Sequence, residues 1–164
     1  MALTLIEEQF YLIAPPGSAE AQQPQISMGA ALDLPLIMPA EKHGLRELME
    51  REAMKFNKPL NLAFEVNAWP LMTDLVKREL GYTVLSYASV HEMVARGDVA
   101  AVPIVSPQLY RALAIVTPKD LPPSLATLKL AEIIREQVRL QVDQGLWRGR
   151  PLFTDAEPQA RGAK

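Results

Sequence analysis

Apolar residues along the chain follow two periods, one typical of strands and one typical of helices. Short runs of aromatic and β-branched residues that stop at proline or glycine predict strands, over residues 9–14, 34–38, 60–66, 82–86, 99–104 and 111–117. Between these runs, apolar residues recur every three or four positions. This spacing predicts helices, over residues 45–56, 69–80, 89–96 and 124–144.

Strands and helices alternate through residues 34–104. A helix between two strands supplies the long connection that parallel neighbours need, so the pattern predicts an α/β fold with a mainly parallel sheet. Two consecutive strands, residues 99–104 and 111–117, then interrupt the alternation. We expect the chain to pass from one lobe to another at that point, and also at residues 34–38.

Two of the predicted helices are amphipathic. The first carries charged residues opposite its apolar stripe: Arg46, Glu47, Glu50 and Arg51. The last carries opposite charges three positions apart on its polar side, and we expect it to bury its apolar residues in the core. Those residues are Leu128, Leu130, Ile133, Ile134, Val138 and Val142.

Three phrases of the sequence stand in an order that one protein family shares. They are LPLIMPAEKHGLRELME from Leu34, ELGYTVLSYASVHEMVARGDVAAVPI from Glu79, and LYRALAIVTPKDLPPSLATLKLAEIIREQV from Leu109. In this order they resemble the effector-binding domain of LysR-type transcriptional regulators. The resemblance covers about residues 5 to 147, which is most of the chain.

The resemblance implies a two-lobed fold of the periplasmic-binding-protein type 2 kind. The outer lobe would combine residues 1–35 with 105–148, the inner lobe would be residues 36–104, and residues 149–164 would form a tail. The family's winged helix-turn-helix, and the opening strands of its first lobe, have no counterpart in the chain. We therefore expect an incomplete first lobe with an exposed strand edge, and homo-oligomers that cover it.

Composition narrows the classes of protein. The 164 residues carry a formal net charge of -2, with lysine and arginine scattered, so DNA contact is expected only through an absent N-terminal domain. The absence of cysteine excludes disulfides and thiolate chemistry. The N-terminal residues lack the pattern of a secretory signal, and no apolar run approaches the ~20 residues that span a bilayer. We expect a cytoplasmic protein without membrane contact.

Asn67, Ala68 and Trp69 form the first candidate site. Asn67 is placed to cap the helix that follows, with Pro70 in its first turn. Helix N-termini attract carboxylates and phosphates, and by the resemblance this turn faces the cleft and contacts a small-molecule effector, for which a carboxylate is the natural choice. The alternative interpretation is plain capping by Asn67 and core packing of Trp69.

The loop with Pro39, Ala40 and His43 is the second candidate site. It leaves the strand over residues 34–38 and opens the next helix, and by the resemblance it also borders the cleft. Lys42 and His43 would then assist an anionic group. The alternative interpretation is a solvated helix start in which His43 is an ordinary polar residue.

The sequence offers no pattern for catalysis, a metal or a cofactor. Ser89, His91 and Asp98 lack the nucleophile elbow of a hydrolase, and a serine and a histidine two apart on one helix point in different directions. The two histidines do not form a zinc motif, and no phosphate-binding glycine loop occurs. We interpret the chain as a ligand-sensing regulatory domain and not an enzyme. The alternatives are a stand-alone solute-binding protein and a ligand-free oligomerisation fragment.

Overall fold

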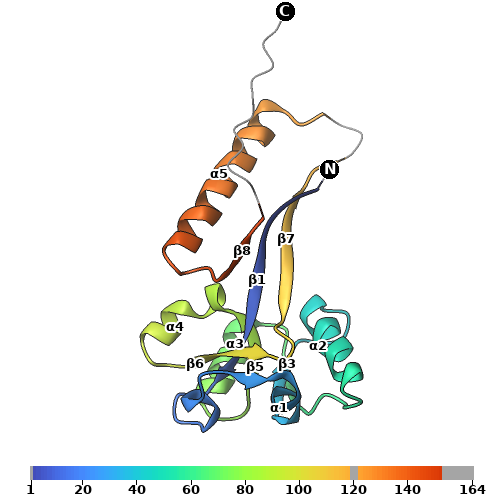
Figure 1. The fold of residues 1–164 in the computed structure, drawn as a ribbon, viewed down its shortest axis with the longest axis vertical. Coiled ribbons are helices and arrows are strands. Elements are labelled where there is room, and N and C mark those ends of the chain that lie inside the picture. The colour runs from blue at the N-terminus through green and yellow to red at the C-terminus, as the bar shows by residue number, and fades with distance from the viewer. Residues whose placement is uncertain (1, 119–121, 153–164) are drawn as a thin grey trace, which may run out of the picture.

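The computed structural model describes residues 2–118 and 122–152. The molecule has a narrow part, made of β1, β7, β8 and α5, which stands on a broader part that holds the other elements (Figure 1). The strands are β1 (Ala2–Ala14), β2 (Ile26–Ser27), β3 (Leu36–Met38), β4 (Leu62–Glu65), β5 (Thr83–Ser86), β6 (Ala100–Val105), β7 (Tyr110–Val116) and β8 (Gly149–Pro151). The α-helices are α1 (Met28–Asp33), α2 (Gly44–Lys55), α3 (Trp69–Lys77), α4 (His91–Ala95) and α5 (Leu125–Asp143). Two short 3₁₀ turns are η1 (Glu20–Gln22) and η2 (Tyr87–Ser89).

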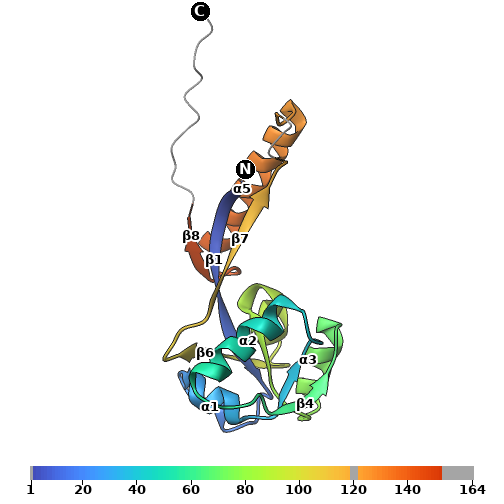
Figure 2. The ribbon, with the colours of Figure 1, turned by 90° about the vertical axis from the view of Figure 1, so that its right-hand side faces the viewer.

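One long strand, β1, runs through both parts of the molecule (Figure 2). Its first half lies between β7 and β8, with Gln9 opposite Tyr110 at the end of the β7 pairing. Its second half, from Phe10 onward, lies between β5 and β6. β1 therefore joins β7 and β8 to β5 and β6 in one six-stranded sheet and is the first connection between the two parts.

The prediction of a mainly parallel sheet is wrong for β1, which runs antiparallel to β5, β6, β7 and β8. The pairing is antiparallel because β1 runs into the broad part, whereas β6 and β7 carry the chain back out of it in the opposite direction. The predicted parallel pairing holds for β2 with β6 and for β3 with β4, and β3 also meets Tyr82 in a parallel bridge. The α/β class is confirmed.

Two separate hydrophobic cores divide the described chain. The larger core takes buried residues from Phe10 to Leu109, and the smaller core has Leu5, Ile6 and Val138 at its centre. We call residues 10–109 the inner part, and residues 2–9 with the described residues from 110 to 152 the outer part.

This division differs from the predicted lobes, which placed residues 1–35 in the outer lobe. In the structure, Ile26, Met28 and Leu32 pack in the larger core with β3 and β6. The sequence pattern at residues 34–38 suggested a crossing strand, but the strand that crosses is β1. The chain crosses back between Leu109 and Tyr110.

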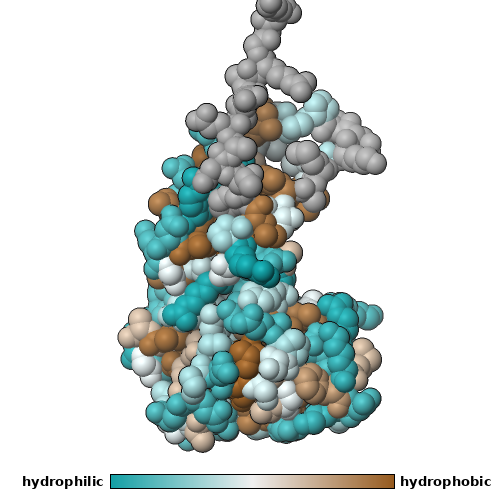
Figure 3. All heavy atoms as spheres, viewed as in Figure 1, coloured by the Kyte–Doolittle hydropathy of each residue, from teal (hydrophilic) through white to brown (hydrophobic). Residues whose placement is uncertain are grey.

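α5 has the predicted bounds within one residue, but it does not bury the residues that we expected. Val138 is buried, Ile134 and Val142 pack partly against the smaller core, and the others of the expected set are exposed; these are Leu128, Leu130 and Ile133. Apolar side chains accordingly reach the surface of the outer part (Figure 3). A helical period identifies an apolar face, but it does not supply the partner that covers the face.

α2 buries two of its charged residues, against expectation for Arg46. Arg46 is 6% exposed, and Glu52 is equally buried with its Oε1 bonded to Lys55. At the other end of the chain, β8 was predicted as part of a tail but pairs with β1. Residues 153–164 of that predicted tail lie outside the described residues. Among the described residues, no helix is long and apolar enough to cross a bilayer.

Candidate functional site

The two predicted loops lie next to each other in the structure. β3 and β4 are parallel neighbours, so the loops that follow them leave the sheet at the same edge. The backbone N–H of Ala40 donates a hydrogen bond of 3.0 Å to Oδ1 of Asn67. This bond fixes the Pro39–His43 loop to the turn before α3, and the two candidate sites become one.

Asn67 does not cap α3, contrary to the prediction. The N-cap is Ala68, which has no side-chain cap, and Pro70 lies in the first turn as expected. The Asn67 side chain is directed to Ala40 instead, one residue too early to reach the first N–H groups of the helix. Trp69 is 51% exposed, so it does not pack in the core and presents its indole to solvent.

His43 is the N-cap of α2. Its Nδ1 accepts a hydrogen bond of 3.2 Å from the N–H of Leu45, and its side chain is exposed. Lys42, directly before it, has a φ of 67°, in the left-handed region. The geometry therefore accounts for His43 as a helix cap, whereas contact of His43 with an effector stays a prediction.

Arg46 holds the Pro39–His43 loop in place through hydrogen bonds and ion pairs, a role that was not predicted from the sequence. Its Nη1 donates to the carbonyl of Pro39 at 3.3 Å, and its guanidinium also pairs with Glu50 at 2.6 Å and Glu65 at 3.5 Å. Glu65 ends β4, so this buried cation joins the ends of β3 and β4. The phrase HGLR contains Arg46, but helical spacing alone predicted that Arg46 lies on the solvent-exposed face of α2.

A third loop follows β5, which begins beside β3 at the parallel bridge between Leu36 and Tyr82. Ser86 is 5% exposed, and its Oγ lies 3.1 Å from Oγ of Ser89, so a hydrogen bond closes the η2 turn between them. Tyr87 is half-buried in this turn. Ser86 and Tyr87 were not among the predicted site residues, and their position after a buried strand was the signal in the sequence that could have identified them.

A groove of 420 Å³ lies between the start of α3 and α4. Its walls include Trp69, Pro70, Ser89, His91 and Met93. The groove combines apolar surface with hydroxyl and imidazole groups, which suits a small organic ligand. It contains one of the six predicted effector residues, Trp69.

The residues weighed as a triad have separate partners. Ser89 bonds to Ser86, Nδ1 of His91 lies 3.0 Å from the carbonyl of Ala88, and Asp98 pairs with Arg96 at 3.2 Å. The hydrogen bond from Arg96, followed by that from Lys77, holds the pKa of Asp98 below its ordinary value. The described residues contain no group of histidines and carboxylates that could hold a metal ion.

The comparisons with known proteins agree in pointing to one family. The model of the LysR substrate binding domain matches residues 2–139. The HTH-type transcriptional regulator BbuR of Bordetella bronchiseptica is 25% identical over 118 residues, which are 72% of this chain and 36% of that protein.

Solved structures share the fold at low identity. The effector binding domain of QuiR in complex with shikimate has a TM-score of 0.71 at 18% identity, and covers 85% of this chain and 66% of its own. The regulatory domain of Synechocystis PCC6803 CcmR in complex with 2-PG has a TM-score of 0.75 at 15% identity, with coverages of 85% and 67%. The chain thus spans about a third of the curated relative and two thirds of the solved domains. With the family model matched along most of its length, the chain belongs to the LysR substrate-binding domain family.

Proposed function

We propose that the chain is the ligand-sensing regulatory domain of a LysR-type transcriptional regulator. The observation that carries the proposal is that the loops after β3, β4 and β5 lie together, since Ala40 is bonded to Asn67, and Trp69 and Ser89 line one groove. Related domains support it, since the solved QuiR and CcmR domains are in complex with shikimate and 2-PG.

The effector would bind between the two parts, against the joined loops. Its contacts would be Pro39, Ala40, His43, Asn67, Ala68 and Trp69. In the first turn of α3, Pro70 has no N–H and the N–H of Leu71 donates to the Ala68 carbonyl at 3.0 Å, which leaves the N–H of Trp69 as the donor for a ligand. The exposed indole of Trp69 offers an apolar face beside it. A small organic carboxylate combines both features that this surface recognises.

Regulation would work through differential affinity. An effector that binds one arrangement of the two parts more tightly shifts the population toward that arrangement, without making or breaking a bond. A separate N-terminal domain would contact DNA, because this chain has a net charge of -2 and no basic stripe. A regulator of bacterial DNA works in the cytoplasm, and we propose that location.

We also propose that the chain forms homo-oligomers. Leu125 is 87% exposed and begins the uncovered apolar face of α5, and β7 pairs only with β1 among the described residues. An edge strand without proline or lysine is a ready site for another strand. Light scattering at micromolar concentration tests this proposal, and a strictly monomeric chain would contradict it.

A thermal-shift screen against small organic acids, amino acids and phosphorylated metabolites tests the sensing function. The variant is Asn67→Ala, and the matched control is Asn61→Ala. Asn61 binds the carbonyl of Asp33 at 3.0 Å, at the opposite end of β4. An effector at one hundred times its Kd stabilises the native state by about 2.7 kcal/mol.

The expected result is a ligand that raises the midpoint of the parent and of Asn61→Ala, but not of Asn67→Ala. Equal shifts in all three proteins would place the ligand elsewhere. An absence of any shift across the panel would contradict the proposal and favour the ligand-free oligomerisation fragment.

A further inference from the structure

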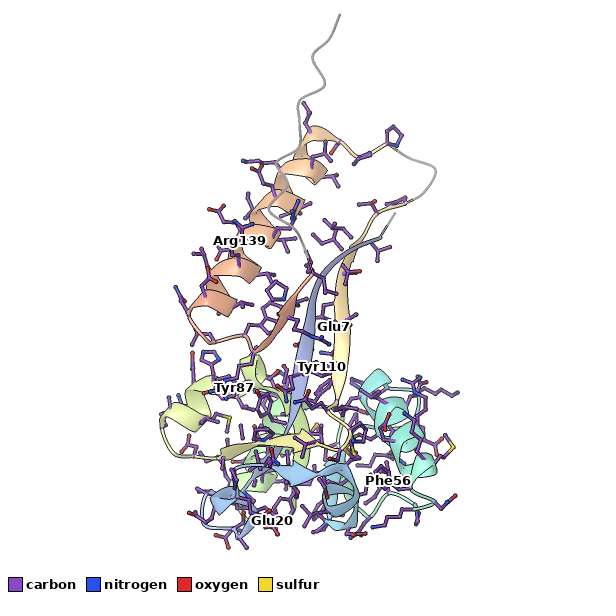
Figure 4. All side chains as sticks on the ribbon, viewed as in Figure 1. Glu7, Glu20, Phe56, Tyr87, Tyr110 and Arg139 are labelled. Carbon is purple, nitrogen blue, oxygen red and sulfur yellow. The ribbon has the colours of Figure 1, made fainter. Side chains whose placement is uncertain are left out.

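Arg148 forms a side-chain contact between the two parts. It belongs to the outer part, in the turn between α5 and β8, and its guanidinium carbon lies 3.5 Å from the centre of the Tyr87 ring in the inner part. A second inner ring, Tyr11, lies 5.7 Å from the same carbon and packs at a tilt against Tyr87, with 5.8 Å between the ring centres. In Figure 4, Tyr87 lies at the top of the inner part, directly beneath the turn that ends α5.

The backbone of Arg148 is held firmly on the outer side. Its carbonyl accepts a hydrogen bond of 3.1 Å from the N–H of Gln9. On one side of it, Nε1 of Trp147 donates to the buried carboxylate of Glu8 at 3.0 Å. On the other side, Gly149 approaches β1 so closely that a Cβ would meet Cα of Glu8 at 2.9 Å. The Arg148 backbone is therefore fixed to the outer part, and its long side chain extends from there to Tyr87.

Tyr87 is fixed equally well, and it connects with the candidate site. It follows Ser86 in the turn that the Ser86–Ser89 hydrogen bond closes, and Ala88 and Ser89 line the groove beside Trp69. A ligand in that groove contacts the same turn that carries the Tyr87 ring. The stack is thus within one residue of the surface where an effector would bind.

We propose that the stack of Arg148 on Tyr87 is a latch that sets the relative orientation of the two parts, and that an effector acts on orientation through the η2 turn. The second half of this proposal rests on the proposed sensing function, whereas the first half does not. The peptide crosses between the parts at Gln9–Phe10 and at Leu109–Tyr110, and Phe10 donates to the carbonyl of Leu109 at 2.9 Å. These two strands lie side by side and act as a hinge, so a contact away from them is needed to fix the angle.

Spin labels measure the orientation directly. The chain has no cysteine, so Arg51→Cys on α2 and Gln137→Cys on α5 create two unique attachment sites on exposed positions of the two parts. Pulsed electron–electron double resonance then gives the distribution of distances between the two spin labels. Labelled chains are diluted with unlabelled chains, so that distances between labels on different chains of an oligomer do not contribute.

The test variants are Arg148→Ala and Tyr87→Leu, and Tyr87→Phe keeps the aromatic ring. The matched control is Arg150→Ala. Arg150 stacks on Tyr110 at 5.1 Å and pairs with Glu7 at 3.0 Å, so it makes the same kinds of contact entirely within the outer part. Far-UV circular dichroism confirms that each variant is folded.

A cation over a partly exposed ring favours the latched arrangement about two- to fivefold. We expect Arg148→Ala and Tyr87→Leu to broaden the distance distribution or add a second distance, and Tyr87→Phe and Arg150→Ala to keep the parent distribution. A parent distribution in both Arg148→Ala and Tyr87→Leu would overturn the latch, and so would equal broadening in Arg150→Ala.

The effector half has its own readout. A ligand found by the thermal-shift screen should change the distance distribution of the parent but not of Tyr87→Leu. A ligand that changes both equally would overturn this half and leave the latch intact. If the screen finds no ligand, the sensing function fails, while the distances in the unliganded variants still decide the latch.

Discussion

The inner and outer parts belong to the same chain but bury their apolar residues to different degrees. The inner part buries residues from β1, β3, β5, β6 and the helices around them in one cluster, whereas the outer part centres on Leu5, Ile6 and Val138. α5 contributes most of its apolar face to the surface. The difference teaches that amphipathic elements fold into a stable unit only when each apolar face meets another. The stability of the chain should therefore reside in the inner part.

The largest expected effect comes from one leucine in each part. Leu36 is fully buried in β3, whereas Leu130 on α5 is 57% exposed. In the dilute monomer, Leu36→Ala should reduce the free energy of unfolding by about 2–5 kcal/mol, and Leu130→Ala by less than about 0.5 kcal/mol. Urea denaturation measures both. An equally large cost for Leu130→Ala at higher concentration would show that a partner covers α5 in solution.

A tight backbone contact in the outer part gives the second prediction. Gly149→Ala places a Cβ against the Glu7 carbonyl and 2.9 Å from Cα of Glu8. The strand pair has to separate, at a cost of about 1–3 kcal/mol. Hydrogen exchange should report the loss in β8 and β1 while β5 and β6 keep their protection. The control is Gly44→Ala, where a Cβ meets nothing within 4 Å, and matched exchange in both variants would contradict the expectation.

The hydrogen bond between the two candidate loops gives a smaller effect. Asn67→Ala removes the acceptor for the Ala40 N–H and should cost about 0.5–1.5 kcal/mol in thermal or urea denaturation. Asn67→Asp keeps an oxygen in place and should recover most of the loss. If Asn67→Ala is as stable as the parent, the loops are held together by other contacts.

The smallest effect concerns pH. The Arg96 hydrogen bond holds the pKa of Asp98 below its ordinary value of 3.8 in the folded chain. Its stabilising contribution is therefore present above that value and is lost as the pH falls through the lower folded value. Asp98→Asn should lower the urea midpoint slightly at pH 7 and by a smaller amount at pH 3. A difference of equal size at both pH values would rule out this ionisation as its source.

The sequence predicted α2 to α5 and most strands of this fold because their periods are strong, but it missed the short α1 and β2. It missed the first half of β1, where Glu7 and Glu8 interrupt the apolar run. In the structure these carboxylates pair with Arg150 and Arg111, from strands more than a hundred residues away. It also missed β8, because three residues with an arginine and a proline carry no periodic signal. The local sequence pattern cannot predict strand pairing that depends on residues far away in the sequence.

The candidate site was predictable in outline and not in detail. By the family resemblance, the loops with Ala40 and Asn67 were both expected to border the cleft, and in the structure a hydrogen bond joins them. The roles of individual side chains depend on a residue's exact position in a turn, so Asn67 binds a loop and His43 caps a helix. The burial of Arg46 depends on Glu65, which lies in another element. Contact of these residues with an effector stays a prediction.

The shared strand has a consequence for how the chain is made. β1 is translated before all its partners, and its inner half must wait for Thr83 and later residues before it gains a neighbouring strand. The ribosome adds about 5–20 residues per second, so this apolar strand spends several seconds in the cell without its sheet. Pairing over such long separations in sequence is slow. Synthesis of this chain should therefore depend on chaperones that shield β1 until the rest of the sheet emerges.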